Sequence, residues 1–177
     1  MRIVAGAWRG RPVIAPAGQA TRPTSDRARE ALFSMLQSRL GSFEDLRVAD
    51  LFAGTGALGL EALSRGAAHC TFVETDRAAL DALKRNVAAF GVQERADIRS
   101  QDATRAAGGP FHLAFLDPPY RSGLGGKALT SLMAAGTLAP GALISVETAR
   151  DEQALVPGLT VEVERTYGKA KLTLLRA

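Results

Sequence analysis

The apolar residues of this chain follow two patterns, short continuous runs typical of buried strands and longer stretches with helical spacing. From Arg47 onward the two patterns alternate along the chain. Strands are predicted at 47–52, 69–74, 96–100, 111–117 and 142–147, and helices at 57–66, 77–90 and 126–135. This alternation predicts an α/β fold with a doubly wound, mostly parallel sheet that helices cover on both faces. Two further β-type runs, at 159–166 and 170–176, predict an antiparallel hairpin that closes the sheet edge.

The first 40 residues show a different pattern. Short alternating runs at 2–5 and 11–15 flank a glycine-containing turn, which predicts a small β-hairpin with Trp8 at its tip. A connector rich in Pro, Gly and Thr follows, and Thr24 or Ser25 is placed to cap a helix over 26–40. One face of this helix is apolar, with Ala28, Leu32, Met35, Leu36 and Leu40 at helical spacing. We therefore expect a small hairpin and a helix as an N-terminal extension, with the helix packed on the main sheet.

Length and composition limit the class of protein. The 177 residues, of which 46% are hydrophobic, suffice for one buried core, so we expect a single domain over 1–177. The single cysteine, Cys70, lies in an apolar strand pattern, and the two histidines, His69 and His112, do not belong to a cluster of metal-binding residue types, so we expect no metal site. No run has the length of a membrane span or of a signal peptide core. We expect a cytoplasmic monomer without a membrane partner.

The segment 48–59, VADLFAGTGALG, has the pattern of a strand, a tight turn and a helix. Gly54 and Gly56 allow backbone angles that side chains forbid, so a small ligand can approach the bare backbone. The spacing matches the dinucleotide fingerprint, and Glu74 follows at the end of the next strand, where it can bind a ribose diol. Asp50 argues against NAD or FAD, because a carboxylate at this turn repels a pyrophosphate and attracts a cation. The expected ligand is S-adenosylmethionine, which carries a sulfonium, an ammonium and no phosphate. A glycine turn that only packs helix on strand is the alternative.

The sequence Asp117-Pro118-Pro119-Tyr120 directly follows the very apolar run 111–116. The two prolines fix their own backbones and contribute no N–H, so Asp117 and the Pro118 carbonyl are held as hydrogen-bond acceptors. An exocyclic base amine needs such acceptors, and Tyr120 offers a flat face on which an extruded base can stack. The motif therefore predicts methyl transfer to a base amine, with a merely proline-stiffened turn as the alternative.

The excess positive charge of the chain lies in its first 40 residues. This part holds seven arginines against two carboxylates, a net charge of +5, whereas the remaining 137 residues carry 15 basic and 16 acidic side chains. Guanidinium groups bind phosphate, so the asymmetry predicts RNA binding by the hairpin and helix of residues 1–40, through Arg2, Trp8, Arg9 and Arg11. An ordinary solvated surface is the alternative for the arginines, and a hydrophobic plug is the alternative for Trp8.

Four motifs together resemble the S-adenosylmethionine-dependent amino-methyltransferases: DLFAGTGALGLEALSRGA at 50–67, FVETD at 72–76, QDA at 101–103 and LDPPY at 116–120. The N-terminal MRIVAG and RGR and the run RPTSDRAREALFSML at 22–36 resemble more narrowly the bacterial 16S rRNA (guanine(966)-N(2))-methyltransferase family. The resemblance covers essentially the whole chain, including LISVE at 143–147 and YGKAKLTLL at 167–175. The N-terminal block is the specific part, because many methylases share the other motifs.

This resemblance implies a seven-stranded, Rossmann-like methyltransferase sheet and S-adenosylmethionine as the methyl donor. It implies that Glu74 binds the ribose, that Asp102 accepts from the adenine amine and that the Ala103 backbone reads the ring edge. The implied cofactor-binding residues are Arg22, Thr24, Asp50, Phe52, Ala53, Gly54, Gly56, Glu74, Asp102 and Ala103. The implied catalytic residues are Asp117, Pro118, Pro119 and Tyr120. The implied substrate is the N2 amine of a guanine in 16S rRNA, within an assembled or assembling 30S subunit.

Two other functions stay open at this point. One is N6 methylation of adenine in DNA or RNA, although the chain has no recognisable second domain for reading a duplex sequence. The other is a non-catalytic S-adenosylmethionine-binding factor in ribosome assembly. Intact Asp117 and Tyr120 favour catalysis over this last function.

Overall fold

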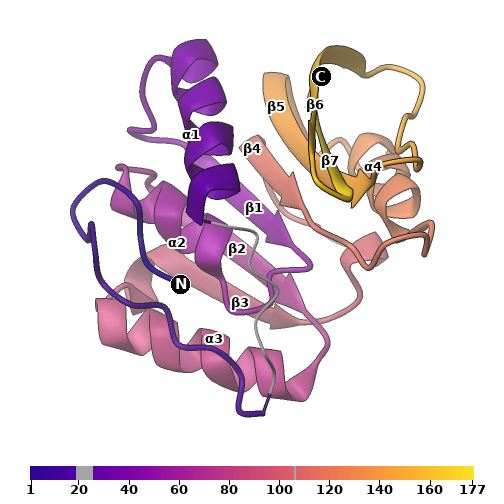
Figure 1. Ribbon diagram of the computed structural model, residues 1–177. Coiled ribbons are helices and arrows are strands. Elements are labelled where there is room, and N and C mark those ends of the chain that lie inside the picture. The colour runs from indigo at the N-terminus through magenta and orange to yellow at the C-terminus, as the bar shows by residue number, and fades with distance from the viewer. Residues whose placement is uncertain (19–25, 106) are drawn as a thin grey trace.

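The computed structural model describes residues 1–18, 26–105 and 107–177 (Figure 1). The predicted capping residues Thr24 and Ser25 lie outside this described part. The helices are α1 (Asp26–Leu40), α2 (Ala57–Ser64), α3 (Arg77–Phe90) and α4 (Leu124–Ala134), with the short 3-10 helices η1 (Gln93–Arg95) and η2 (Ala103–Arg105). The strands are β1 (Arg47–Leu51), β2 (His69–Glu74), β3 (Ala96–Ser100), β4 (Phe111–Leu116), β5 (Leu138–Ala149), β6 (Thr160–Tyr167) and β7 (Ala170–Arg176).

Within the described residues, seven strands form one sheet in the order β3-β2-β1-β4-β5-β7-β6. The neighbours from β3 to β5 run parallel, whereas β7 runs antiparallel to both β5 and β6. This arrangement confirms the predicted mostly parallel α/β sheet and its hairpin edge. Within the sheet, the first strand along the chain is β1. The next two strands, β2 and β3, lie on one side of β1, and β4 lies on its other side. The strand order therefore reverses between β1 and β4, and ligands of open α/β sheets bind at the carboxyl ends of strands at such a point.

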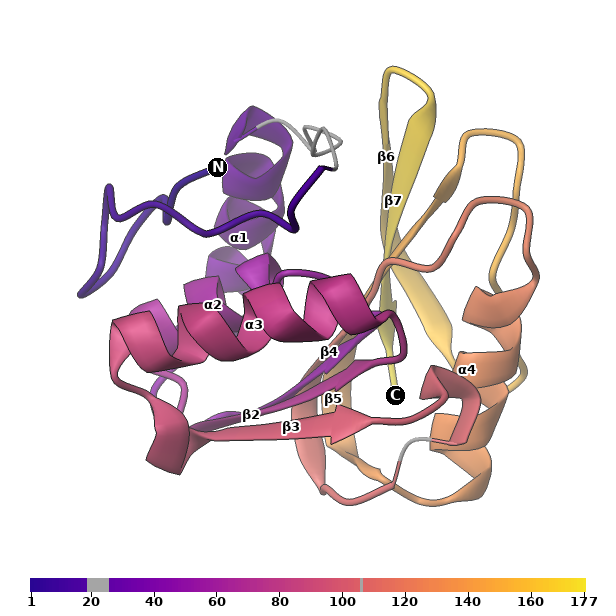
Figure 2. The same ribbon diagram turned by 90° about the horizontal axis from the view of Figure 1, so that it is seen from below.

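Helices cover both faces of the sheet (Figures 1 and 2). Alternate residues along each strand point to opposite faces, which divides the core in two. Val48, Phe72 and Phe115 are fully buried on the face that packs against α1, α2 and α3. On the other face, buried residues such as Leu51 and Leu116 pack against α4. In the part of the chain that the structure describes, no helix is both long and apolar enough to cross a membrane.

The predicted ends of α3 are confirmed, and a capping residue in the sequence marks each of them. The α3 helix begins after Asp76, whose carboxylate accepts from the Ala79 N–H at 2.8 Å, and ends at Gly91, which has a φ of 67°. The α1 helix and strands β2 and β3 also have the predicted bounds. The α4 helix starts two residues earlier than predicted, and β5 is longer at both ends, reaching from Leu138 to Ala149.

The two N-terminal runs pair antiparallel as predicted, through a bridge between Arg2 and Pro12 and through hydrogen bonds from the Ile3 N–H to the Arg11 carbonyl at 3.0 Å and from the Val13 N–H to the Met1 carbonyl at 2.9 Å. Other backbone donors of the two runs bind the body of the protein, and the Ile14 N–H donates to the Asn86 side chain of α3 at 2.7 Å. The N–H groups of Val4 and Ala5 donate to the Glu61 carboxylate of α2 at 2.8 and 2.9 Å. Because side chains of α2 and α3 satisfy these donors, the N-terminal segment is attached to the helical layer and forms no free-standing hairpin.

Candidate active site

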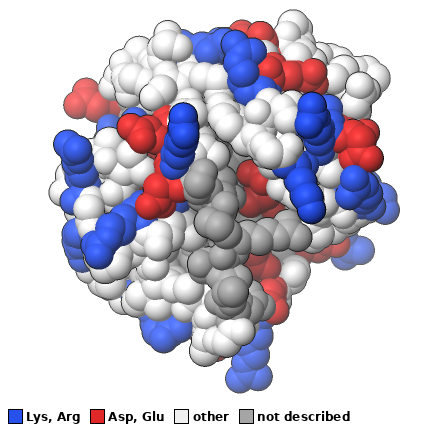
Figure 3. All heavy atoms as spheres, viewed as in Figure 1, with Lys and Arg blue, Asp and Glu red and all other residues white. Residues whose placement is uncertain are grey.

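A pocket of about 1580 Å³ opens at the carboxyl ends of the central strands. Its described lining includes six carboxylates: Asp50 from β1, Glu74 from β2, Asp76 directly before α3, Asp102 after β3, Asp117 directly after β4 and Glu147 from β5. Figure 3 shows acidic side chains in the hollow near the centre of the view, with basic side chains around it. The pocket therefore has a negative interior at the point where the strand order reverses.

The glycine turn after β1 forms one wall of this pocket. Phe52 has a φ of 63° and Gly54 a φ of 56°, and a Cβ built on Gly54 would meet no atom of the described residues within 4 Å, so this backbone offers room for a ligand. Gly56, with a φ of 82°, has a different role. Its Cβ would lie 2.4 Å from the Cδ1 atom of Leu83, and Gly56 is not among the residues that line the pocket. Gly56 therefore allows the start of α2 to pack closely on α3.

Asp50 is a buried carboxylate at the base of the pocket, with 2% of its surface exposed. It accepts a hydrogen bond from the Gly59 N–H of α2 at 2.9 Å. Burial raises the pKa of the Asp50 carboxyl well above its ordinary range, and the charges of Asp117 and Glu74 raise this pKa further, against the lowering effect of the Gly59 hydrogen bond. A positively charged ligand in the pocket would stabilise the ionised form of Asp50.

Glu74 is the last residue of β2, and Asp102 lies two residues after the end of β3. One Glu74 oxygen accepts from the Gly54 N–H at 2.8 Å, and the other accepts from the N–H groups of Thr75 and Asp76 at 2.7 and 2.8 Å. This network joins the end of β2 to the glycine turn. Asp102 is exposed, and hydrogen bonds from the backbone and hydroxyl of Thr104 lower the pKa of its carboxyl.

The proline motif forms the wall opposite the glycine turn. Pro118 is buried, and Gly125 of α4 leaves room for it, since a Cβ on Gly125 would lie 3.2 Å from the Pro118 ring. Arg121, with a φ of 55°, donates its N–H to Glu152 at 2.9 Å and pairs with Asp151 at 2.7 Å. The turn is thus fixed by its own prolines and by the loop after β5.

Glu147 is a site residue that the sequence interpretation missed. The Tyr120 hydroxyl donates to its Oε1 atom at 2.6 Å, so the carboxylate orients the aromatic ring of the proline motif. Glu147 ends the apolar run ALISV on β5, whose carboxyl end lies beside that of β4. A carboxylate after a predicted strand was the available signal. The turn between β6 and β7 was also missed, although Tyr167, Gly168 and Lys169 line the pocket.

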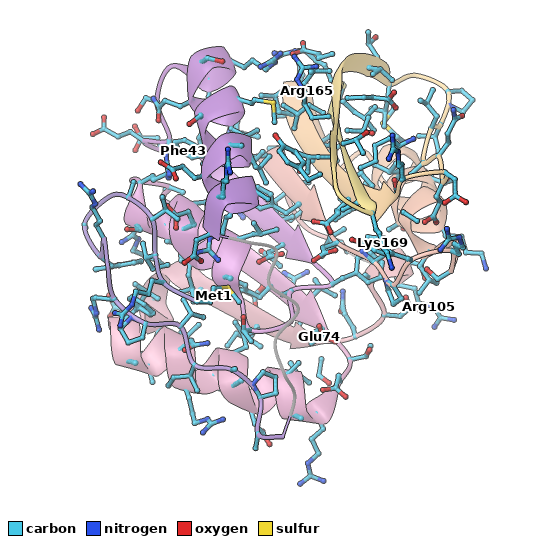
Figure 4. The ribbon with its side chains drawn as sticks, viewed as in Figure 1. Met1, Phe43, Glu74, Arg105, Arg165 and Lys169 are labelled. Atoms are coloured by element: carbon cyan, nitrogen blue, oxygen red, sulfur yellow. The ribbon has the colours of Figure 1, made fainter. Side chains whose placement is uncertain are left out.

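The structure brings most of the predicted cofactor and catalytic residues into this one pocket. Its described lining includes Asp50, Phe52, Ala53, Gly54, Glu74, Asp102, Ala103, Asp117, Pro118, Pro119 and Tyr120. Arg22 and Thr24 lie outside the described residues. Figure 4 labels Met1, Glu74 and Lys169, three lining residues that come from the N-terminal segment, the end of β2 and the β6–β7 turn.

The predicted RNA-binding residues Arg2, Trp8, Arg9 and Arg11 do not line the pocket. Trp8 is half-buried with its ring centroid 5.1 Å from that of Phe90, which is the contact expected of a hydrophobic plug. The Arg11 guanidinium lies 4.4 Å from the Phe90 ring centroid and donates to the Ala89 carbonyl at 2.7 Å. Arg2 donates to the Gly10 carbonyl, and Arg9 is exposed. An RNA-binding role of these four residues stays a prediction.

Comparison with known proteins gives three informative relatives. The Haemophilus influenzae ribosomal RNA small subunit methyltransferase D is 38% identical over 95% of this chain and 89% of its own length. The Escherichia coli protein of the same name is 42% identical over 84% of this chain and 74% of its own length. A solved structure from Escherichia coli, of the candidate methyltransferase yhhF, superposes with a TM-score of 0.87 at 36% identity, covering 99% of this chain and 97% of that one.

The model of the family described as conserved hypothetical protein 95 matches residues 1–176. That match takes in the glycine turn, the proline motif and the N-terminal block. Together with the identity to the methyltransferases above, it shows that this chain belongs to the conserved hypothetical protein 95 family, which it shares with the ribosomal RNA small subunit methyltransferases D.

Proposed function

We propose that this protein transfers a methyl group from S-adenosylmethionine to the exocyclic N2 amine of a guanine in the 16S rRNA of the small ribosomal subunit. The observation that carries the proposal is the single pocket in which the glycine turn faces Asp117-Pro118-Pro119-Tyr120. The names of the Haemophilus and Escherichia relatives support ribosomal RNA as the substrate. We further propose that the enzyme acts as a cytoplasmic monomer on an assembled or assembling 30S subunit.

The carboxylates and the open backbone of the pocket fit S-adenosylmethionine. The six carboxylates of the described lining, one of them the buried Asp50, repel a pyrophosphate and attract a sulfonium and an ammonium. Asp50 and the open backbone at Gly54 would hold the methionine part of the cofactor. Glu74 would bind the ribose hydroxyls, and Asp102 with the Ala103 backbone would bind the adenine. When bound, the cofactor supplies an electrophilic methyl group.

The residues of the proline motif would prepare the guanine amine for transfer. The lone pair of that amine is delocalised into the ring, so the amine is a weak nucleophile until its hydrogens are held. The Asp117 carboxylate and the Pro118 carbonyl would accept these hydrogens, and Asp117 would take the proton that the amine releases. Tyr120 would stack on the extruded base, with its ring oriented by Glu147.

The test is to supply the protein with methyl-labelled S-adenosylmethionine and one of three substrates: 30S subunits, naked 16S rRNA, or DNA. Digestion to nucleosides and chromatography identify the modified base, and primer extension locates it. We expect N2-methylguanosine at one position of 16S rRNA. Label in N6-methyladenosine would replace the guanine assignment with an adenine one. Cofactor binding without any transfer would favour a non-catalytic assembly factor.

A further inference from the structure

We propose that the tip of the β6–β7 hairpin, residues 165–169, binds the RNA backbone, with Arg165 and Lys169 contacting phosphates beside the guanine in the pocket. The inference rests on the proposed function, because it assigns the surface on which the same site holds its substrate. The arginine-rich N-terminal segment was the expected location of that surface. The hairpin tip is favoured by its position, its charge and its rigidity.

The strand register places the hairpin tip in the same row as Glu147, which holds Tyr120 of the proline motif. Glu147 of β5 lies opposite Leu172 of β7, which lies opposite Arg165 of β6, so these three residues form one row across the sheet. Residues directly opposite on neighbouring strands share a face, and the row spans about 10 Å. Tyr167 and Lys169 line the pocket itself. Figure 2 shows the hairpin extending beyond the rest of the sheet, where a large ligand can reach it.

The hairpin carries two cations that no carboxylate neutralises. Its acidic residues already have basic partners, because Glu162 pairs with Arg39 and Arg176, and Glu164 lies 3.8 Å from Lys171. Among the described residues, neither Arg165 nor Lys169 has an ion-pair partner, and both are exposed. Figure 4 labels both side chains on the side of the molecule where Figure 1 places β6 and β7. The tip therefore has unneutralised positive charge at the rim of an acidic pocket.

This distribution of charge suits a nucleotide of RNA. The Watson–Crick edge of guanine presents N–H donors, which suit the carboxylates Asp117 and Glu147 inside the pocket. The same carboxylates repel a phosphate, so the backbone of an inserted nucleotide must stay at the rim. Cations at the rim would bind it there, because phosphate contacts supply most of the affinity of a protein for a nucleic acid.

The tip is also held in place before any RNA binds. The β7 strand pairs with β5 on one side and β6 on the other, and the Lys169 carbonyl accepts from the Arg150 N–H at 2.9 Å. Two of the N-terminal arginines, by contrast, bind other parts of the protein itself. Arg2 binds the Gly10 carbonyl, and Arg11 stacks on Phe90 and binds the Ala89 carbonyl.

The experiment compares the double variant Arg165→Ala, Lys169→Ala with a matched control, Lys84→Ala, Arg85→Ala, which removes the same charge from exposed positions on α3. Affinity for naked 16S rRNA is measured at several salt concentrations, and S-adenosylmethionine affinity reports correct folding. We expect the hairpin variant to flatten the slope of log affinity against log salt by about 1.4 to 1.8 units, the loss of two phosphate contacts. The control should keep the wild-type slope, and cofactor affinity should stay unchanged in both.

Methyl transfer to 16S rRNA separates the two proposals. Wild-type protein that binds the cofactor but modifies no 16S rRNA would overturn the proposed function and this inference with it. If the wild type methylates its RNA and the hairpin variant keeps the wild-type salt slope, only the inference is overturned. Equal flattening in the hairpin variant and the α3 control would also overturn it, because the effect would then be one of net charge. A single charge reversal, Lys169→Glu, should weaken RNA binding more than Lys169→Ala does.

Discussion

At the scale of single residues, the pocket is defined by carboxylates that follow strands. Each of the strands β1, β2, β4 and β5 brings one carboxylate to the same end of the sheet. Backbone donors hold two of these groups, since Asp50 accepts from the Gly59 N–H and Glu74 accepts from three backbone N–H groups. A concentration of negative charge of this kind costs stability unless a cation or a proton offsets it.

Asp50 should make the stability of the ligand-free protein depend on pH. Its pKa is raised by burial in the folded state, whereas in the unfolded chain it is about 3.9. Between these two values the folded protein holds a proton that the unfolded chain has lost, so the free energy of unfolding falls as pH rises through this window. Asp50→Asn removes this loss while keeping an acceptor for Gly59. Urea unfolding at several pH values should show a stability gain for the variant that grows with pH. A gain that does not change with pH would contradict the prediction.

Tyr120 and Glu147 should act as one unit. Tyr120→Ala removes the ring and should reduce turnover by about 100-fold, whereas Tyr120→Phe keeps the ring and should cost about 10-fold or less through the lost hydrogen bond. Glu147→Ala removes the same hydrogen bond and should resemble Tyr120→Phe. The measurement is single-turnover methyl transfer to 16S rRNA.

The double variant Tyr120→Phe, Glu147→Ala tests how Glu147 acts. If Glu147 only positions the ring, the double variant should be no slower than the slower single variant, because both changes remove one interaction. Additive losses would show instead that Glu147 contacts the substrate directly.

Most site residues could be predicted because each motif is local in the sequence. Asp50, Glu74, Asp102 and Asp117 each end or follow a recognisable strand pattern, so their positions at one end of a parallel sheet follow from the fold class. Glu147 also ends a predicted strand, at 142–147, but its contact with Tyr120 could not be predicted in this way. Its hydrogen bond to Tyr120 joins residues 27 positions apart and exists only because β5 lies next to β4.

At the scale of elements, the N-terminal segment is attached to the body by one buried carboxylate. Glu61 of α2 is fully buried and accepts from the N–H groups of Val4 and Ala5 and from Arg65 Nε at 3.0 Å. The buried Arg29 of α1 lies 4.0 Å from the same carboxylate and donates to the Arg2 carbonyl. Glu61 thus joins α1, α2 and the N-terminal segment.

Glu61→Ala should lower the free energy of unfolding by about 3 to 5 kcal/mol, because it removes a buried charge beside the buried Arg29 and leaves two backbone donors without their acceptor. Chemical denaturation followed by circular dichroism measures the change. Asp81→Ala, at an exposed position of α3, is the control and should change stability by less than about 0.5 kcal/mol. A loss below about 1 kcal/mol for Glu61→Ala would show that the segment is held mainly by its apolar contacts.

Element boundaries could be predicted where capping chemistry is local. Asp76 and Gly91 mark both ends of α3 in the sequence. The extra residues of β5 could not be predicted, because Pro140 and Gly141 disfavour a strand by themselves. They belong to β5 only because Leu138 pairs with Phe111 before a register shift. The N-terminal hairpin was predicted longer than it is, since its donors bind side chains that lie more than 50 residues away in the sequence.

At the scale of the whole molecule, the sheet brings two motifs, more than 50 residues apart in the sequence, into one pocket. The glycine turn and the proline motif face each other because β1 and β4 are neighbours with parallel register. The excess of arginine in residues 1–40 did not by itself identify the RNA-binding surface that we propose. Several N-terminal arginines make contacts within the protein, whereas Arg165 and Lys169 on the β6–β7 hairpin have no ion-pair partner in the described part of the chain.

The central claim is that this pocket is a methyltransferase site in which Asp117 acts on the amine and not on the cofactor. The most direct measurement compares Asp117→Ala with the wild type, by calorimetric titration of S-adenosylmethionine and by single-turnover methyl transfer to 16S rRNA. Cofactor affinity should stay nearly unchanged while turnover falls by about 100-fold or more, because the acceptor stabilises mainly the transition state. Unchanged turnover, or a loss of cofactor affinity that accounts for the whole loss of turnover, would contradict the account.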